Sequence, residues 1–457
     1  MEKKENFKRT VLKIAFPVTL QSLLQSSFSV IDQMMIGKLG SNSIAGIGLG
    51  GKFASLYSVV LAAIATAAGI MISQYIGAND KKSVSRSFFV NLFLSIGLAG
   101  IFMVFCIACP DFIMAVYTKD EAARILAADY LRILAISFLP MAVSSIVTTM
   151  LRCMEAAALP LYASIFALVL NTGLNYVLIF GKGFFPAMGV EGAAYASVIA
   201  QTVSCILILV FFWGYIRRRD MDVMAGWGTL WRGPERKQPY DSSYRRQYLK
   251  ILCPMLLCDF MWSLGENIYT AIYGNIGTDA CAAMTMTIPI QTLMIGALSG
   301  LSQAASILIG KSLGAKQYGK AYIESKKLIK YGLAGSVILS VLLLIFGPFY
   351  VEIYSVRPSL HEMTRSILIV FAIVSPVKVL NMILGGGIIR SGGKTKYVMW
   401  IDMAGTWLFG VPFGLLAAFV WKLPIEYVYF ILSMEECVRL GITLVLFRRK
   451  TWMESLQ

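Results

Sequence analysis

Long apolar runs alternate with short charged breaks along the whole chain. Runs such as 11–36, 87–108 and 328–348 carry at most one or two charges over about 20 residues, which as helix can cross a hydrocarbon core about 30 Å thick. The pattern predicts an all-α polytopic membrane protein. Its twelve expected transmembrane helices are 11–36, 44–76, 87–108, 123–150, 160–180, 193–216, 250–273, 281–310, 328–350, 362–388, 397–420 and 426–447.

Composition supports this interpretation. Of 457 residues, 57% are hydrophobic and only 14% are charged, which excludes a disordered chain and a water-soluble enzyme. Eight cysteines are scattered through apolar segments and are expected to be small buried side chains rather than disulfides. Cys106 and Cys109 have CxxC spacing, but no second pair accompanies them and His361 is the single histidine, so no metal cluster is expected.

Basic residues fall mainly on one side of the predicted membrane plan. Most of the 41 Lys and Arg lie in the N-terminus, the C-terminal tail and the loops 77–86, 152–159, 217–250, 311–330 and 389–396. The positive-inside bias predicts a multi-pass protein of a bacterial-type inner membrane with both termini in the cytoplasm. This topology and anionic lipid headgroups account for the net charge of +16, so we expect no nucleic-acid partner, and we expect a monomer.

The second half of the chain repeats the first. Residues 12–17 (LKIAFP) match residues 249–254 (LKILCP) at a shift of 237. The same register relates Gly37 to Gly274, Gly40 to Gly277, Gly77 to Gly314 and, at a shift of 238, Arg152 to Arg390. Six spans plus six give both halves the same topology, related by a pseudo-two-fold axis along the membrane normal with a central cavity between two lobes. The predicted parts are an N-terminal six-helix lobe (1–216), a cytoplasmic linker (217–247) and a C-terminal six-helix lobe (248–457).

Several motifs carry a resemblance to a known family. Residues 37–40 (GKLG) end the first helix, and the turn at residues 151–152 has its repeat partner in residues 389–395 (IRSGGKT). Residues 171–181 (NTGLNYVLIFG) are followed by residues 189–197 (GVEGAAYAS). Over nearly the whole chain, these features closely resemble the multidrug and toxic compound extrusion (MATE) transporters. The resemblance implies a V-shaped protein that exports amphipathic, often cationic compounds by alternating access, with Na⁺ or H⁺ as coupling ion and no other cofactor.

Polar residues at membrane depth are candidate sites because they are costly there without a partner. On the first span, Gln21, Gln25, Ser29 and Asp32 share one helical face. The resemblance implies that Asp32 is the cation-coupling acid, and the alternative is a hydrogen bond at the membrane interface. Asn171, Asn175 and Ser197 are expected to complete a Na⁺ cage with Asp32 or to hold a protonatable Asp32. The alternative for the asparagines is interhelical hydrogen bonding.

A second polar stripe follows the seventh span. It comprises Asp259, Ser263, Glu266 and Thr270, with Asn267 beside it. With Gln25 and Ser29, we expect Asp259, Glu266, Asn267, Lys378 and Asp402 to line the substrate cavity, and Glu266 to form a buried ion pair with Lys378. Asp402 lies near a helix end, so an interfacial role is an equal alternative. We interpret Glu435, Glu436 and Arg439 as a separate structural cluster, because Glu435 and Arg439 form an i, i+4 pair.

Pro17 interrupts the first span and is a predicted hinge, although its repeat mate Pro254 also fits a shared geometry at the start of each lobe. The leading hypothesis is therefore a cation-coupled antiporter, with a lipid-linked saccharide flippase of the wider superfamily as the alternative. An intramembrane enzyme is not expected, since Asp32 and Glu266 fall in different predicted lobes and the one histidine forms no cluster. The chain also has no GxxxxGK[ST] nucleotide-binding loop.

Overall fold

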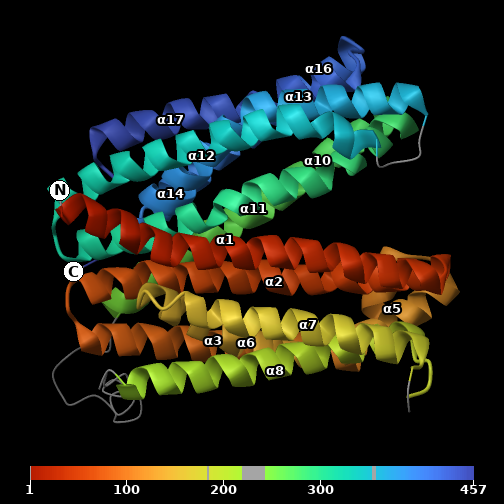
Figure 1. Cartoon of the computed structure of the whole chain (residues 1–457), viewed down its shortest axis with the longest axis horizontal. Coiled ribbons are helices and arrows are strands. Elements are labelled where there is room, and N and C mark those ends of the chain that lie inside the picture. The colour runs from red at the N-terminus through yellow and green to blue at the C-terminus, as the bar shows by residue number, and fades with distance from the viewer. Residues whose placement is uncertain (1, 183–184, 219–241, 353–356, 457) are drawn as a thin grey trace. The chain divides into compact units, whose positions relative to one another are not determined.

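The structure, a computed structural model, describes residues 2–182, 185–218, 242–352 and 357–456, with the backbone alone at residues 2–6, 29, 30, 33, 41, 42, 242 and 243. All regular elements in these ranges are helical (Figure 1). They are α1 (Glu2–Ile36), η1 (Gly37–Leu39), α2 (Ser41–Gly77), α3 (Lys81–Ala108), α4 (Pro110–Tyr117), α5 (Glu121–Leu134), η2 (Ala135–Ser137), α6 (Phe138–Cys153), α7 (Ala158–Phe180), α8 (Gly189–Arg218), α10 (Ser242–Ile276), α11 (Thr278–Gly314), α12 (Tyr318–Glu352), α13 (Pro358–Asn381), η4 (Met382–Ile389), α14 (Thr395–Met403), η5 (Ala404–Gly410), α15 (Val411–Leu415), η6 (Leu416–Val420), α16 (Ile425–Ser433) and α17 (Glu435–Arg449).

Each of the twelve predicted spans corresponds to helix. Within the described ranges, ten helical segments are long and apolar enough to cross a membrane, and they match the second to the eleventh predicted span. The first predicted span lies in α1, whose polar stripe makes it less apolar. The twelfth is divided between α16 and α17 at Met434, directly before the acidic pair Glu435 and Glu436. The predicted all-α fold class is therefore confirmed.

The chain forms two compact units. One contains Met1–Thr19, Ser73–Asn79 and Pro239–Gln457, and the other contains Leu20–Ile72 and Asp80–Gln238. Helix α1 thus passes from the first unit to the second after Thr19, and α2 passes back after Ile72. The lobes 1–216 and 248–457 remain a prediction, and most of the predicted linker 217–247 lies outside the described residues.

Each unit has its own apolar core. In the unit of α3–α8, Tyr57 is fully buried, stacks on Phe138 with ring centroids 4.4 Å apart, and donates a hydrogen bond of 2.8 Å to the Phe138 carbonyl oxygen. In the unit of α10–α17, the core gathers around Phe371, Ile367 and Val428, which are fully buried. Because each core draws on several helices of its own unit, each unit has internal packing that supports the positions of its polar side chains.

The repeat extends to backbone conformation. Left-handed φ angles occur at repeat-related positions: Gly40 (93°) and Gly277 (156°), Asn79 (58°) and Lys316 (56°), and Glu155 (61°) and Gly393 (73°). Such angles are uncommon for residues other than glycine, so their recurrence at shifts of 237 and 238 shows that the same turns join the helices in both halves.

Two repeat-related glycines let α2 and α11 approach closely within one unit. A Cβ atom on Gly77 would lie 2.0 Å from the carbonyl oxygen of Lys311, and one on Gly314 would lie 1.9 Å from that of Gln74. Gly77 and Gly314 are repeat mates, as are Gln74 and Lys311, so the contact is reciprocal. Glycine is required on both sides because any side chain would push the two backbones apart.

This crossing predicts that Gly314→Ala lowers stability. The added methyl group meets backbone rather than a movable side chain, so we expect a loss of about 2 kcal/mol, measured by thermal unfolding in detergent. Gly100→Ala is the matched control, since nothing lies within 4 Å of a Cβ atom at that helical position. Equal melting temperatures for the two variants would contradict the role of the crossing.

Candidate functional site

The first candidate site joins α1 to α7. Asn171 and Asn175 lie one turn apart on α7, and Asp32 lies near the end of α1. The Asn175 amide nitrogen donates to Asp32 Oδ1 at 2.9 Å and to Asn171 Oδ1 at 3.3 Å. The structure thus brings together three of the four residues predicted for cation coupling.

The amide nitrogen of Asn175 is hydrogen-bonded, whereas its amide oxygen has no partner. Asn175 is 3% exposed, and its Oδ1 atom is buried without a hydrogen-bond partner, whereas Asp32 is half-buried. An apolar cluster that includes Tyr130, Ile179 and Ile36 packs around this end of α1 and α7. Carboxylate and amide oxygens suit Na⁺, and the free Oδ1 is a spare ligand, although it is the nitrogen of Asn175 that faces Asp32.

Two other predicted residues of this half take no part in the contact among the described side chains. Ser197 on α8 is half-buried, and no hydrogen bond joins it to Asp32, Asn171 or Asn175 among the described side chains. Gln25 is exposed. The side chain of Ser29 lies outside the described residues. Of the four residues predicted for the oxygen cage, three are therefore joined by hydrogen bonds in this arrangement.

Part of the polar stripe of α10 is exposed. Glu266 and Asn267 are exposed, and the Asn267 amide donates to the Ser263 carbonyl oxygen of its own helix at 2.7 Å. Asp259 is half-buried and interacts electrostatically with Arg390.

The predicted ion pair between Glu266 and Lys378 is not a direct contact in the structure, although the two charges interact at longer range. Among the described residues, no acid approaches the Lys378 ammonium group within 4.0 Å, although its charge interacts at longer range with Glu266, Glu436 and the Tyr429 hydroxyl. The physical reason is that Lys378 faces several partners at once, so no single carboxylate is drawn into contact with it.

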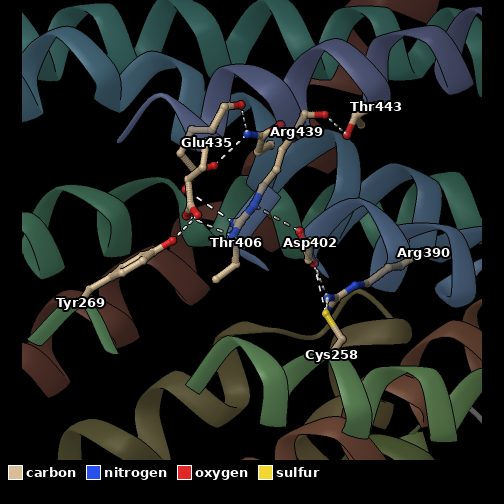
Figure 2. Close-up of polar contacts among 10 residues, drawn as sticks. Cys258, Tyr269, Arg390, Asp402, Thr406, Glu435, Arg439 and Thr443 are labelled. Atoms are coloured by element: carbon tan, nitrogen blue, oxygen red, sulfur yellow. Dashed lines mark hydrogen bonds and ion pairs between the residues drawn. The ribbon is translucent and has the colours of Figure 1, made fainter. Parts of the chain in front are cut away.

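The ionic contacts of this unit centre on Arg439 instead (Figure 2). Its guanidinium lies 3.1 Å from Glu435 and 3.7 Å from Glu436, and all three residues are at most 9% exposed. Tyr269 donates a hydrogen bond to Glu435, and Arg439 donates one to Thr406. The separate cluster predicted from the i, i+4 spacing is therefore present, but it is larger than the sequence indicated.

Asp402 belongs to the same network. Its carboxylate lies 3.9 Å from Arg439 and 3.8 Å from Arg390, and it accepts a hydrogen bond of 3.1 Å from the Cys258 thiol. Figure 2 shows Asp402 between the two arginines. Asp402 therefore lies beside two arginines, in a network that contains three acids in all.

Local backbone features make this network compact. Asp402 and Thr406 lie at the transition from α14 to the π-helical segment η5, and π-helical turns are frequent at functional sites. Gly410 ends that segment, and a Cβ atom there would lie 2.0 Å from the Tyr269 hydroxyl oxygen. The glycine leaves room for the Tyr269–Glu435 hydrogen bond.

Four participants were not predicted as site residues: Tyr269, Arg390, Cys258 and Asn381, whose amide donates to Glu436 Oε2 at 2.8 Å. One signal was available. Arg390 repeats Arg152, and a charged residue kept in both halves at the end of a span indicates a shared contact.

The network predicts that Arg439→Met is strongly destabilising. The change leaves buried Glu435 and Glu436 without their guanidinium, which we expect to cost roughly 3 to 5 kcal/mol in thermal unfolding. Glu266→Gln is the contrasting variant because it breaks no ion pair, and it should stay within about 0.5 kcal/mol of the parent. If Glu266→Gln proved as unstable as Arg439→Met, the result would support a stabilising ion pair between Glu266 and Lys378.

Comparisons with known proteins agree with this fold. The chain is 24% identical over 452 residues to the uncharacterized transporter YisQ of Bacillus subtilis, covering 98% of this chain and 95% of the relative. It is 23% identical over 415 residues to a probable multidrug resistance protein NorM of Thermotoga maritima, covering 90% and 86%. A crystal structure of a MATE protein in complex with MaL6 superposes with a TM-score of 0.84 at 18% identity, covering 97% of this chain and 96% of that one.

The strongest assignment comes from the family comparison. The sequence model of the MatE family matches the chain twice, over residues 17–177 and 254–416, once in each repeat. The two matches include Asp32, Asn171, Asn175 and Asp402, and together they cover most of the chain, whereas α17 with Arg439 lies beyond the second match. The chain is therefore a multi-pass membrane protein that belongs to the MatE family of transporters, which are not enzymes.

Proposed function

We propose that this protein is a NorM-like multidrug efflux transporter that exports amphipathic cations by alternating access, in exchange for H⁺ or Na⁺. The names of the relatives support the efflux of drugs. We further propose that it works as a monomer in a bacterial cell membrane with both termini in the cytoplasm. Pro17, Asp32, Asn171 and Asn175 carry the coupling in this proposal.

The contact between Asp32 and Asn175 is the observation that supports coupling best. When ionised, Asp32 on α1 accepts the hydrogen bond of 2.9 Å from the buried amide of Asn175 on α7 as a carboxylate. A charge-assisted bond of this kind is stronger than a neutral one. Occupancy of Asp32 by a cation thus changes the energy of a contact between two helices, which is what a coupling site requires.

The two candidate ions would use the site differently. A proton would neutralise Asp32 and weaken its bond with Asn175, which frees α1 to move relative to α7. Na⁺ would be held by oxygens of Asp32 and Asn171 and by the unpartnered Oδ1 of Asn175, once that amide turns. In both cases the positive charge is stabilised by the single acid of the site.

Pro17 is the proposed hinge for this movement. Proline has no backbone N–H, so the helix lacks one hydrogen bond there and bends at low cost. Helix α1 passes from one compact unit to the other after Thr19, within two residues of Pro17. A change at Asp32 would therefore be transmitted along α1 to this position.

Charge selects the substrate in this proposal. Glu266 is exposed, and Asp32 and Asp259 are half-buried, whereas the half-buried Lys378 is the base predicted within the cavity. Low-dielectric walls amplify the field of such acids and favour lipophilic cations. A lipid-linked saccharide flippase would need a cationic cavity for phosphate, and the excess of acids does not favour that alternative.

The coupling proposal predicts that Asp32→Asn abolishes gradient-driven efflux while the protein stays folded. The amide keeps the size of the side chain but cannot bind a proton or neutralise Na⁺. Purified protein in vesicles with imposed pH or Na⁺ gradients measures this and identifies the ion. Asp129→Asn, which removes a half-buried acid paired with Arg132 in the same compact unit, is the matched control. Unchanged efflux by Asp32→Asn would refute the role of Asp32.

Substrate sign gives a further prediction. Of two fluorescent compounds of similar size and opposite charge, the lipophilic cation should be exported at least about tenfold faster, because the acids raise its local concentration. Efflux from cells that express the protein is compared with the Asp32→Asn background. Equal or faster export of the anion would contradict the proposal and support the flippase alternative.

A further inference from the structure

The side chain of Gln21 ties α1 to two other helices. Its Oε1 accepts a hydrogen bond of 2.8 Å from Arg152 Nη2 at the end of α6. Its Nε2 donates a hydrogen bond of 2.7 Å to Ser164 Oγ on α7. All three residues belong to one compact unit and are partly buried, so the amide bridges three helices of that unit.

The Gln21–Ser164 bond and the Asp32–Asn175 bond share one register. In each pair the two residues are separated by 143 positions, so eleven residues along α1 correspond to eleven residues along α7. The two helices therefore run parallel with matched steps between the bonds. A slip of one residue would rotate a side chain by about 100° and break either bond. The first bond thus sets the register in which the second can form.

The same three positions meet in the other half of the chain. Gln21, Arg152 and Ser164 repeat as Cys258, Arg390 and Asp402, at shifts of 237, 238 and 238. There the Cys258 thiol bonds Asp402 at 3.1 Å, and Arg390 lies 3.7 Å from Cys258 and 3.8 Å from Asp402 (Figure 2). The recurrence shows that the constellation belongs to the repeated architecture.

The two versions differ in charge. Arg390 faces the carboxylate of Asp402, whereas no carboxylate lies within 4.0 Å of Arg152 among the described residues. The Arg152 Nε atom is buried without a partner. Gln21 therefore supplies the side-chain acceptor that the structure shows for this guanidinium, and substitution by an apolar residue leaves Arg152 without it.

Gln21 also lies directly beyond the proposed hinge. On the near side, Thr19 Oγ1 donates to the Ala297 carbonyl oxygen at 3.2 Å, within the other compact unit. A Cβ atom on Gly300 would lie 2.1 Å from the Ala15 carbonyl oxygen, so this stretch of α1 packs closely on α11. The anchors of α1 thus change from one unit to the other between Thr19 and Gln21.

We propose that Gln21 is a positioning residue for cation coupling: with Arg152 and Ser164 it holds α1 beyond Pro17 in the register that brings Asp32 to Asn175. This inference rests on the proposed role of Asp32. In this proposal the hydrogen bonds of the Gln21 amide fix α1, and thereby position Asp32 three turns further along the helix.

The test measures vesicle efflux as a function of the driving-cation concentration. Gln21→Leu removes both bonds at similar volume, and we expect the half-maximal cation concentration to rise about tenfold while the maximal rate stays within about twofold. Gln21→Glu should restore the parental value, because its carboxylate accepts bonds from Arg152 and from the Ser164 hydroxyl. Ser27→Ala is the control on α1, since its exposed hydroxyl bonds only the Leu23 carbonyl oxygen of the same helix.

The outcomes separate the two proposals. A half-maximal concentration unchanged in Gln21→Leu, with Asp32→Asn inactive, overturns the positioning role alone. An active Asp32→Asn overturns the coupling proposal itself. If Gln21→Leu does not fold, Ser164→Ala is measured in its place, because it removes only the bond between α1 and α7. We expect its half-maximal cation concentration to rise about fivefold. No rise in Ser164→Ala would then overturn the inference.

Discussion

The cost of leaving polar groups unpaired in an apolar surrounding governs both candidate sites. Helix α1 carries a polar face that cannot be satisfied by its own backbone, and α7 presents matching groups three turns apart. A buried polar group without a hydrogen bond costs more free energy than a formed hydrogen bond contributes. The two helices are therefore restricted to the register that satisfies both pairs. The position of Asp32 follows from that restriction.

The two halves meet the same constraint with different chemistry. In the first half, a neutral amide joins Arg152 to Ser164, and Asp32 stands apart as a single acid beside Asn175. In the second half, an acid occupies the equivalent of Ser164, and its charge extends the contact into a buried network with Arg439, Glu435 and Glu436. A single acid with a neutral donor can change its charge at low cost. A network of mutually paired charges resists such a change, which fits a coupling role for the first half and a structural role for the second.

Much of the fold follows from local patterns in the sequence. Apolar run lengths predicted a helix at each of twelve positions, and the repeat predicted a shared topology whose turns recur with left-handed residues at equivalent positions. The site was predictable where partners share a helix face, as for Asn171 and Asn175, and where the repeat assigns a role by analogy. Two expected direct contacts are absent among the described residues, for one reason. The contacts expected for Ser197 and for Glu266 with Lys378 depend on how each helix is rotated about its axis. The spacing of residues within one helix does not specify that rotation.

By itself, the sequence determined which segments are helical, that they come in two related sets of six, and which polar residues lie at membrane depth, because these properties depend on spacing along one chain. The tertiary structure decided which of those residues meet. It joined Asp402 to Arg390 and Arg439, left Glu266 exposed, and gave Gln21 two partners more than 130 positions away. Partner choice is set by packing of apolar faces, which fixes the rotation and register of each helix before any polar contact is counted.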